Sequence, residues 1–514
     1  MTPPPSIDSG GVKTPSCVYL VGSGPGDPGL LTLKAQACLR EADLIVYDYL
    51  ANPAHLKHAS ESAAKVCVGR GFRHKKLSQE KINRLIVGAA KKGRKVVRLK
   101  GGDPYLFGRG GEEALFLRKH GIPFQVVPGI TSAVACATYA GIPLTHRDFS
   151  SSVTFLTGHK ADDKDLDLIP WKSIVSLKKG TIVIYMGFYN LAKIAKLLIK
   201  NGMSKKTPAA VIEWGTLGRQ KSCDTDLVSI AAKSALLKLK APCLIVIGEV
   251  VSLRRQLNWF ERLPLFGKRI AVTRTREQSV TLSEKLEELG AETLEFPTIR
   301  IEPPQSFAWM DRAIRNLPNY DWVVFSSVHG VRSFFDRLSR LGFDSRRFGG
   351  CRVAAVGPQT AEALRNYGLR ADFVPDRYET KALAEAFGRS LKDKKFLLIR
   401  AAIAPTELEG ALNASGAKTT RVDAYRTLLP KPAPHISEAL DAVTFTSAST
   451  VDNFVRLVGL QKARNLSRKA CFASIGPVTS AALRKRGLKV GCEAVRFTTD
   501  GLVEALKKNL EKER

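Results

Sequence analysis

Residues 101–113 read GGDPYLFGRGGEE and directly follow residues 95–99, whose valines and leucine predict a β-strand. So dense a mixture of glycines with a proline, an aspartate and an arginine favours a ligand-binding loop over a simple connector. Two similar turns, GSGPGDPG at 22–29 and PGITSA at 128–133, also follow predicted strands. Because open α/β proteins bind ligands beyond the carboxyl ends of parallel strands, we expect the three turns to converge on one crevice.

A carboxylate is predicted at the same edge of this sheet. The apolar strand at 44–47 ends in Asp48, and a strand-end cap is the structural alternative for this residue. The glycines at 22–26 do not fit the Gly-x-Gly-x-x-Gly spacing, so they match a dinucleotide-binding fingerprint poorly. A tight structural turn is the alternative for them.

The composition of the sequence excludes several classes of protein. The chain has 514 residues, of which 44% are hydrophobic, which excludes global disorder and predicts three or four domains at about 150 residues each. The longest apolar runs, such as 181–186 and 243–247, are too short to span a membrane. Residues 1–15 are rich in proline, serine and glycine and predict a disordered tail without a signal peptide. We therefore expect a soluble, cytoplasmic protein.

Positive charge dominates the sequence: 80 lysines and arginines face 48 acidic residues, a formal net charge of +32. Such a balance favours a polyanionic partner, either nucleic acid or a small molecule rich in carboxylates. A solvated basic surface without a specific ligand is the alternative. The charge is spread along the chain and no aromatic-basic RNA signature accompanies it, which argues against nucleic acid.

Motifs for several other chemistries are missing from the sequence. The nine cysteines lie far apart, with no Cys-x-x-Cys, and the eight histidines include no His-Glu-x-x-His. This pattern favours free thiols and predicts no metal site. The sequence also lacks a Walker A motif and Gly-x-Ser-x-Gly, so nucleotide hydrolysis and Ser-triad catalysis lose support.

The second half of the chain contains an internal repeat. DWVVFSS at 321–327 matches DAVTFTS at 441–447, and VAAVGPQTAEAL at 353–364 matches FASIGPVTSAAL at 472–483. Each copy reads as alternating strands and helices, which predicts two related lobes built on parallel sheets. After a linker at 261–266, we expect a domain at 267–514. Its outer lobe combines 267–300 with 430–514, and its inner lobe is 301–427.

Hydroxyl side chains stand at the predicted helix starts of both lobes. Because helix amino termini bind anions, a cleft between the lobes suits a molecule with many carboxylates. For each residue alone, a simple helix cap is the alternative. The candidate residues are Ser327, Thr360, Ser447 and Thr479.

The first half, 16–260, resembles the tetrapyrrole methylases, and within them the uroporphyrinogen-III C-methyltransferases. The resemblance rests on 21–34, 101–113, 128–147, 185–187 (YMG) and 213–216 (EWGT). It implies two α/β subdomains with S-adenosylmethionine (SAM) between them and a homodimer formed through this half. The positions that match the family's cofactor contacts are Pro25, Gly101, Gly102, Asp103, Leu106, Thr131, Ser132, Met186 and Gly215.

The resemblance also implies roles for two charged residues. Asp48 matches the family's proposed proton acceptor. Arg70, within VGRG at 68–71, stands where the family usually has lysine. Because arginine stays protonated, it cannot donate and regain a proton, so either that acid is not essential or Arg70 anchors a substrate carboxylate.

The second half resembles the uroporphyrinogen-III synthases through VTR at 272–274, FSS at 325–327, DAYRT at 423–427 and the two Gly-Pro turns of the repeat. This family implies cofactor-free cyclisation of hydroxymethylbilane. Positions matching its implicated residues are Thr360, Tyr425 and Thr479. Tyr425 would assist loss of the substrate hydroxyl; a packed hinge tyrosine is the alternative.

Together, the two resemblances predict a bifunctional enzyme that acts on polycarboxylate tetrapyrroles. It would form uroporphyrinogen III and methylate it at C2 and C7 to precorrin-2, on the sirohaem or cobalamin branch, without nucleic-acid or membrane partners. One alternative is a methylase of the same superfamily that acts on ribosomal RNA or a diphthamide precursor. The other is a basic nucleic-acid-binding protein.

Overall fold

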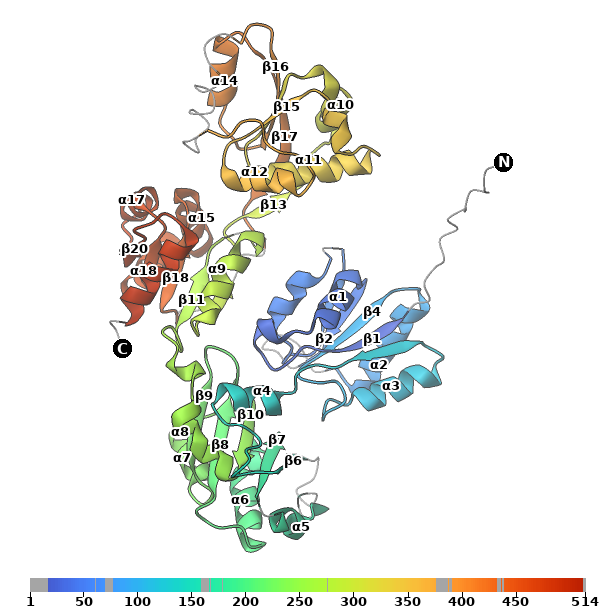
Figure 1. Cartoon of the computed structure of the whole chain (residues 1–514), viewed down its shortest axis with the longest axis vertical. Helices are drawn as coiled ribbons and strands as arrows, with labels where there is room; N and C mark the ends of the chain where they lie inside the picture. Colours follow the sequence, from blue (N-terminus) through green and yellow to red (C-terminus); the bar gives the residue numbers. More distant parts are fainter. Residues whose placement is uncertain are drawn as a thin grey trace.

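The computed structural model describes residues 17–60, 62–69, 77–158, 166, 168–177, 179–274, 276–375, 387, 391–431, 436 and 439–511. Within these residues the strands form four five-stranded sheets, arranged along an elongated molecule (Figure 1). This confirms the α/β fold class. The predicted tail at 1–15 lies outside the described residues.

The first sheet is entirely parallel and has the strand order β3-β2-β4-β1-β5. The central strand β4 is buried along its whole length, as expected for a parallel strand covered on both faces. Side chains alternate between two cores, with Leu44 and Val46 in one and Ile45 in the other. The elements are β1 (Val18–Gly22), β2 (Leu44–Tyr47), β3 (Ala64–Cys67), β4 (Val96–Lys100), β5 (Phe124–Val127), α1 (Leu33–Glu41), α2 (Gln79–Lys91) and α3 (Gly110–Lys119).

The second sheet is mixed, with the order β6-β7-β10-β8-β9 and only the β6–β7 pair parallel. Helix α4 follows the first sheet, and its Ala133 and Ala137 pack into the core of the second. The elements are α4 (Ser132–Tyr139), β6 (Ser152–Thr157), α5 (Trp171–Ser176), β7 (Gly180–Tyr185), α6 (Leu191–Lys200), β8 (Pro208–Glu213), β9 (Lys221–Asp226), α7 (Ile230–Leu236), β10 (Cys243–Ile247) and α8 (Arg254–Leu257).

The third sheet, which we call the outer lobe, is parallel with the order β12-β11-β18-β19-β20. Its core includes the fully buried Leu265, which belongs to the predicted linker. The elements are β11 (Arg269–Val272), α9 (Arg276–Glu288), β12 (Glu292–Glu295), β18 (Ala442–Phe445), α15 (Ala448–Val458), α16 (Leu460–Lys469), β19 (Cys471–Ser474), α17 (Pro477–Lys485), β20 (Cys492–Glu493) and α18 (Thr499–Glu511).

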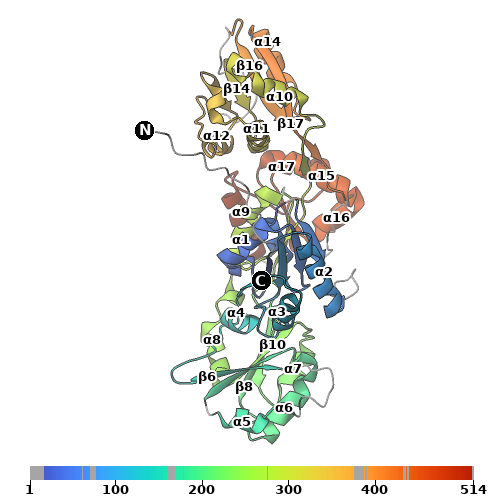
Figure 2. The ribbon, with the colours of Figure 1, turned by 90° about the vertical axis from the view of Figure 1, so that its right-hand side faces the viewer.

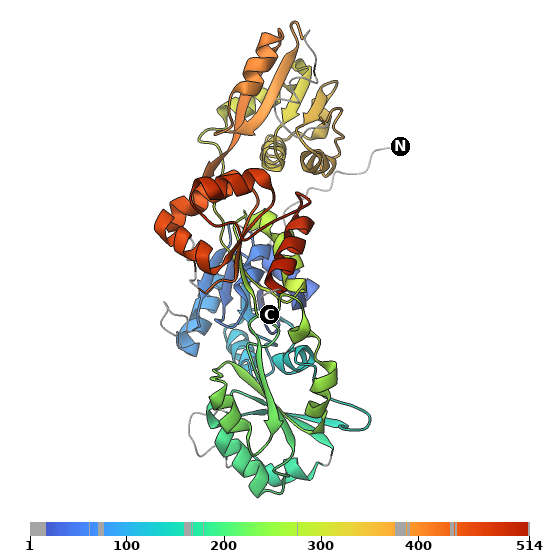
Figure 3. The same ribbon diagram turned by 90° about the vertical axis from the view of Figure 1, so that its left-hand side faces the viewer.

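The fourth sheet, the inner lobe, has the order β13-β17-β16-β14-β15 and is parallel except for β13. Strands β13 and β17 pair antiparallel and lie where the chain passes between the lobes (Figure 3). The elements are β13 (Arg300–Glu302), α10 (Ala308–Arg315), β14 (Trp322–Phe325), α11 (Val328–Arg340), β15 (Arg352–Ala355), α12 (Pro358–Arg365), β16 (Lys395–Ala401), α14 (Glu407–Ala414) and β17 (Lys418–Leu428).

The structure confirms the internal repeat. The inner lobe runs β14, α11, β15, α12, and the outer lobe runs β18, α15, α16, β19, α17, with α16 as an insertion. Phe325 and Phe445, which are equivalent in the repeat, are both fully buried. Helices α11 and α12 lie on the side of the inner lobe that faces the outer lobe, opposite α15 and α17 (Figure 2).

No helix in the described ranges combines the length and the apolar composition that a membrane span requires.

Candidate active sites

The three glycine-rich turns of the first half meet backbone to backbone, as the sequence predicts. Gly24 and Gly102 exchange two hydrogen bonds, of 3.2 Å from the Gly24 amide and 2.8 Å from the Gly102 amide. A Cβ on Gly22 would lie 2.6 Å from Gly129 Cα, and one on Gly129 would lie 2.3 Å from Gly102 O. These contacts require glycine because any side chain would separate the turns.

Asp103 connects the turn at 101–113 to the turn at 128–133 by hydrogen bonds. Its Oδ2 accepts a hydrogen bond of 3.1 Å from the Gly129 amide, and its Oδ1 accepts one of 2.8 Å from the Tyr105 amide. Each bond to a carboxylate is charge-assisted and therefore strong. The predicted cofactor contact of Asp103 would have to share these oxygens.

Tyr185, at the end of β7, joins the second sheet to the turns. Its Oη lies 2.6 Å from Thr131 Oγ1 and accepts a 3.2 Å bond from the Ala133 amide. The next residue, Met186, is half exposed and adopts a φ of 53°. Met186 therefore reaches solvent beside the start of α4, where Thr131 and Ser132 lie.

A second connection runs from the first glycine-rich turn to the loop after β8. The Asp27 amide donates to Thr216 Oγ1 at 3.0 Å, and Tyr139 donates to Asp27 Oδ2 at 2.6 Å. Gly215, which precedes Thr216, packs against α4, because a Cβ on Gly215 would lie 2.5 Å from Cys136 Sγ. Loops that follow the two sheets of the first half are therefore in direct contact.

The predicted cofactor contacts on these loops combine polar and apolar groups. The glycine-rich turns offer backbone amide and carbonyl groups. Leu106 and Met186 offer apolar contacts, and Ser132 offers a hydroxyl. Pro25, Gly101 and Gly102 are partly accessible on the same loops. A compact polar and apolar mixture of this kind is typical of small-molecule sites.

Beside the turns lies a buried cluster of four charged side chains. Arg98 and Lys100 are on the same face of β4, because they are two residues apart. The Arg98 guanidinium donates to Asp48 Oδ1 at 2.5 Å and to Glu113 Oε1 at 3.0 Å. Lys100 Nζ lies 3.1 Å from Glu113 Oε2 and 3.9 Å from Asp48 Oδ2. Asp48 is 32% exposed whereas the other three are at most 3% exposed, so only Asp48 opens toward solvent.

Burial lowers the pKa of Lys100, the charge of Arg98 lowers it further, and Glu113 and Asp48 oppose this effect. Sequence analysis did not single out Arg98, Lys100 or Glu113 as site residues. The available signal was two basic side chains in alternate positions of a strand that is otherwise apolar. Arg70, the other predicted charged residue of this half, lies outside the described residues.

In the inner lobe, Tyr425 and Ser327 come together from β17 and from the start of α11. Their hydroxyl oxygens are 2.9 Å apart, and Ser327 Oγ also accepts a 3.1 Å bond from the Gly330 amide. Burial raises the pKa of Tyr425, and the hydrogen bond with Ser327 opposes this. The tyrosine is 8% exposed, so the packed-tyrosine interpretation and the proposed role are both compatible with its position.

The other predicted hydroxyls occupy equivalent places in the two lobes. Ser447 caps α15 by accepting a 3.3 Å bond from the Thr450 amide. Thr360 and Thr479 lie in the first turns of α12 and α17 and are 6% and 3% exposed. The structure therefore places all four at helix starts. Their helices α11, α12, α15 and α17 lie where the two lobes face each other (Figure 2).

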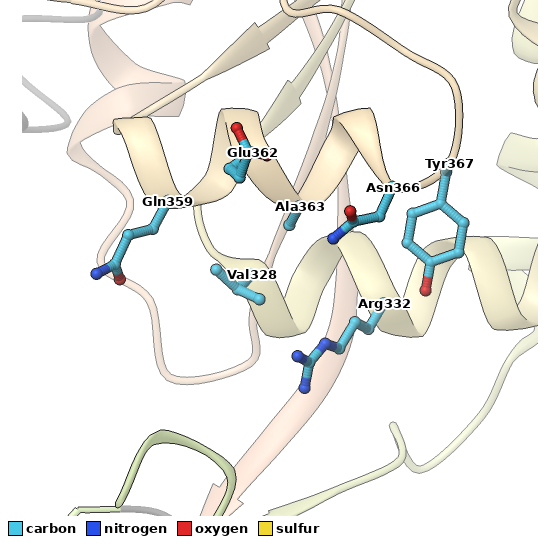
Figure 4. Close-up of a pocket in the computed structure, with 7 residues that line it drawn as sticks. All are labelled: Val328, Arg332, Gln359, Glu362, Ala363, Asn366 and Tyr367. Carbon is cyan, nitrogen blue, oxygen red and sulfur yellow. The ribbon is translucent and has the colours of Figure 1, made fainter. Parts of the chain in front are cut away.

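A cavity of about 300 Å³ lies between α11 and α12 (Figure 4). Sequence analysis did not single out its lining, which mixes polar and apolar residues of α11 and of α12 with the two residues that follow it. The lining residues are Val328, Arg332, Gln359, Glu362, Ala363, Asn366 and Tyr367. Within the part of the chain that the structure describes, no three His, Cys, Asp or Glu side chains gather as metal ligands.

Comparison with known proteins also separates the chain into two halves, with the boundary between residues 231 and 280. The family described as Tetrapyrrole (Corrin/Porphyrin) Methylases matches residues 17–231, and the family described as Uroporphyrinogen-III synthase HemD matches 280–504. The chain is 38% identical to the porphyrin biosynthesis protein HemD of Ruminiclostridium josui over 95% of this chain and 97% of that one.

Two further similarities are to C-methyltransferases. The chain is 40% identical to the uroporphyrinogen-III C-methyltransferase of Bacillus subtilis, over 68% of this chain and 72% of that protein. The uroporphyrin-III C-methyltransferase of Thermus thermophilus, solved with S-adenosyl homocysteine, is 37% identical. It covers 46% of this chain and 99% of its own, with a TM-score of 0.39.

Proposed function

Because the chain belongs to the family that joins a tetrapyrrole methylase to a uroporphyrinogen-III synthase, we propose the course of its two reactions. The chain is a bifunctional enzyme of tetrapyrrole biosynthesis. The second half cyclises hydroxymethylbilane to uroporphyrinogen III, and the first half methylates that product at C2 and C7 with SAM, giving precorrin-2. The observation that carries this proposal is the presence, in one chain, of three converging glycine-rich turns beside a partly open carboxylate and of hydroxyls at the helix starts of two lobes.

The first half aligns two reactants and removes a proton. When bound, SAM supplies an electrophilic methyl group on a sulfonium. We propose that Leu106, Thr131, Ser132, Met186 and Gly215 hold it against the three turns. Asp48 then accepts the proton that the macrocycle loses from another position as the ring carbon is methylated. Arg98 and Lys100 fix the orientation of the Asp48 carboxylate. Alignment of the two reactants, SAM and the macrocycle, supplies most of the rate enhancement.

The second half works with neutral groups. Ser327, Thr360, Ser447 and Thr479 stand at helix starts, where amide groups favour the substrate's carboxylates. The Tyr425 hydroxyl, held 2.9 Å from Ser327 Oγ, donates a hydrogen bond to the departing substrate hydroxyl. This donation stabilises the charge that develops as the C–O bond breaks.

A homodimer formed through the first half is part of the same proposal. Exposed apolar side chains occur on that half, among them Tyr105, Phe107 and Val134. Sedimentation of the full chain would decide the oligomeric state.

One assay tests both activities. Purified full chain is given hydroxymethylbilane with and without SAM, and products are resolved by isomer. We expect type III uroporphyrinogen without SAM and a doubly methylated product with SAM. Only type I uroporphyrinogen, which forms spontaneously, would contradict the synthase role, and unmethylated type III product in the presence of SAM would contradict the methylase role.

A further inference from the structure

The loop after β8 connects the proposed SAM site to the outer lobe of the synthase half. Gly215, a predicted cofactor contact, lies between Trp214 and Thr216, whose φ angles are 49° and 70°. Non-glycine residues adopt this left-handed conformation only where their surroundings hold them in it. The next residues of the loop, Gly218 and Arg219, make contacts that hold it.

Gly218 lies directly against the outer lobe. Its carbonyl accepts a 3.0 Å hydrogen bond from the Gly267 amide, just before β11. A Cβ on Gly218 would lie 2.4 Å from the Glu292 amide nitrogen and 2.5 Å from the Ala291 carbonyl carbon. The loop and the start of β12 are therefore in backbone contact, which leaves little room for independent movement.

Arg219 links the outer lobe to Trp214. Its guanidinium carbon lies 3.9 Å from the centre of the Trp214 ring, and its Nη1 lies 3.4 Å from Glu292 Oε1. Glu292 is 12% exposed, and its other oxygen accepts a 3.0 Å bond from Arg269 on β11. The carboxylate is thus fixed by the outer-lobe sheet, and through Arg219 it fixes the aromatic residue that precedes Gly215.

A second contact joins the same two parts of the molecule. Helix α9 of the outer lobe presents Glu284, whose Oε1 lies 3.8 Å from Lys57 Nζ in the first half. Glu287, one turn further along, is partly buried, and its burial together with the charge of Asp27 in the first glycine-rich turn raises its pKa. The outer lobe therefore approaches both turns that meet at the Asp27–Thr216 hydrogen bond.

We propose that the outer lobe of the synthase half holds the 214–216 turn in its SAM-binding conformation, with Arg219 as the positioning residue. This inference rests on the proposed SAM site. Arg219 touches neither reactant; it acts through Trp214. The synthase half thereby raises the affinity of the methylase half for SAM, in addition to its own catalysis.

The test measures SAM binding to the full-length chain by calorimetry, with the methylation KM for SAM and kcat as a second readout. Arg219→Ala removes both the ring contact and the ion pair, and Glu292→Gln removes only the anchoring charge. We expect the Kd for SAM to rise about tenfold for the first and about threefold for the second. The kcat at saturating SAM should stay unchanged, because the reacting groups are not altered.

Three further variants sharpen the result. Arg219→Lys keeps the charge and should restore part of the affinity. The double variant of Arg219→Ala with Glu292→Gln should bind no more weakly than Arg219→Ala, because both changes break one link. Arg486→Ala breaks an outer-lobe ion pair with Asp452 of 2.8 Å, far from the loop, and should leave the Kd unchanged.

The outcomes separate this inference from the proposed function. A Kd within twofold of wild type for both Arg219→Ala and Glu292→Gln overturns the positioning role while leaving the SAM site intact. Failure of the wild-type chain to bind SAM overturns the proposed methylase function itself. Thermal unfolding of each variant, together with its synthase activity, shows that the fold is retained.

Discussion

The candidate site of the methylase half consists of charged side chains, whereas that of the synthase half consists of neutral hydroxyls. In the methylase half, Asp48 stands in a cluster with Arg98, Lys100 and Glu113, three side chains that are almost fully buried. In the synthase half, the corresponding groups are the neutral hydroxyls of Ser327 and Tyr425, joined at 2.9 Å. The difference follows the chemistry proposed for each half: one must take up the proton released on methylation, and the other must hold a polyanion while a hydroxyl leaves.

A buried charge cluster and a pair of hydroxyls also respond differently to mutation. Removing one member of a charged cluster leaves its partners buried without compensation. Removing one hydroxyl leaves a neutral group that loses only a hydrogen bond. The comparison can therefore be tested by single substitutions in each half.

The largest effect is expected from Glu113→Gln, which removes the buried carboxylate that Arg98 and Lys100 share and leaves them the partly exposed Asp48. We expect the free energy of unfolding of the methylase half to fall by about 3–5 kcal/mol, measured by urea unfolding of the full chain. Glu112→Gln is the matched control, because Glu112 pairs with Arg109 on the surface at 2.6 Å and should change stability very little. An equal loss of unfolding free energy in Glu113→Gln and Glu112→Gln would show that the buried cluster contributes no more to stability than a surface ion pair.

Asp48→Asn keeps the shape of the side chain but removes the proposed proton acceptor. We expect methylation kcat to fall about 100-fold or more, with synthase activity unchanged. Asp43→Asn changes a carboxylate at the other end of β2, which accepts a 2.8 Å bond from the Lys95 amide, and should leave kcat near wild type. Similar kcat values for the two variants would favour the strand-end cap interpretation of Asp48.

Glu287 lies at the boundary between the halves and gives a pH-dependent effect. Burial raises its pKa from 4.5 to about 6, helped by the charge of Asp27 and opposed by the Thr293 hydrogen bond and Lys57. Because the folded protein holds this proton more tightly than the unfolded chain, the stabilisation is complete below about pH 4.5 and is lost as the pH rises through 6.

Glu287→Gln should therefore be more stable than wild type at pH 7.5, by about 1–2 kcal/mol, and no more stable at pH 4.5. Thermal unfolding at the two pH values measures this difference. The neighbouring exposed Glu288→Gln is the control and should behave like wild type at both. A pH-independent difference would show that Glu287 is not buried against the methylase half.

The smallest effects are expected at the two equivalent serines of the repeat. Ser327→Ala and Ser447→Ala each remove a helix cap and should lower stability by about 1 kcal/mol, measured by urea unfolding. Only Ser327→Ala should also lower the synthase kcat, because only Ser327 holds Tyr425. Equal synthase rates in the two variants would show that the Ser327–Tyr425 contact is structural.

Much of the fold was predictable because its signals are local or repeated. The three turns follow apolar strands, and their convergence follows from a parallel sheet. The repeat predicts the matching positions of Phe325 and Phe445. The helix starts at Ser327 and Ser447 follow from cap chemistry, which depends on residues three apart.

The buried cluster and the Arg219 link were not predictable in this way. The sequence shows Arg98 and Glu113 as a basic strand residue and an acidic helix residue, and only the packing of α3 on β4 brings them to 3.0 Å. Likewise, nothing in the loop at 214–219 indicates that it meets Glu292, which belongs to another sheet.

The sequence by itself determined which segments become strands, turns and helix starts, because these depend on alternation, glycine and capping residues within a few positions of each other. Tertiary structure alone decided which charges are buried together and which loops the outer lobe holds. Those outcomes depend on the desolvation and close packing of residues distant in the chain, and no local pattern records them.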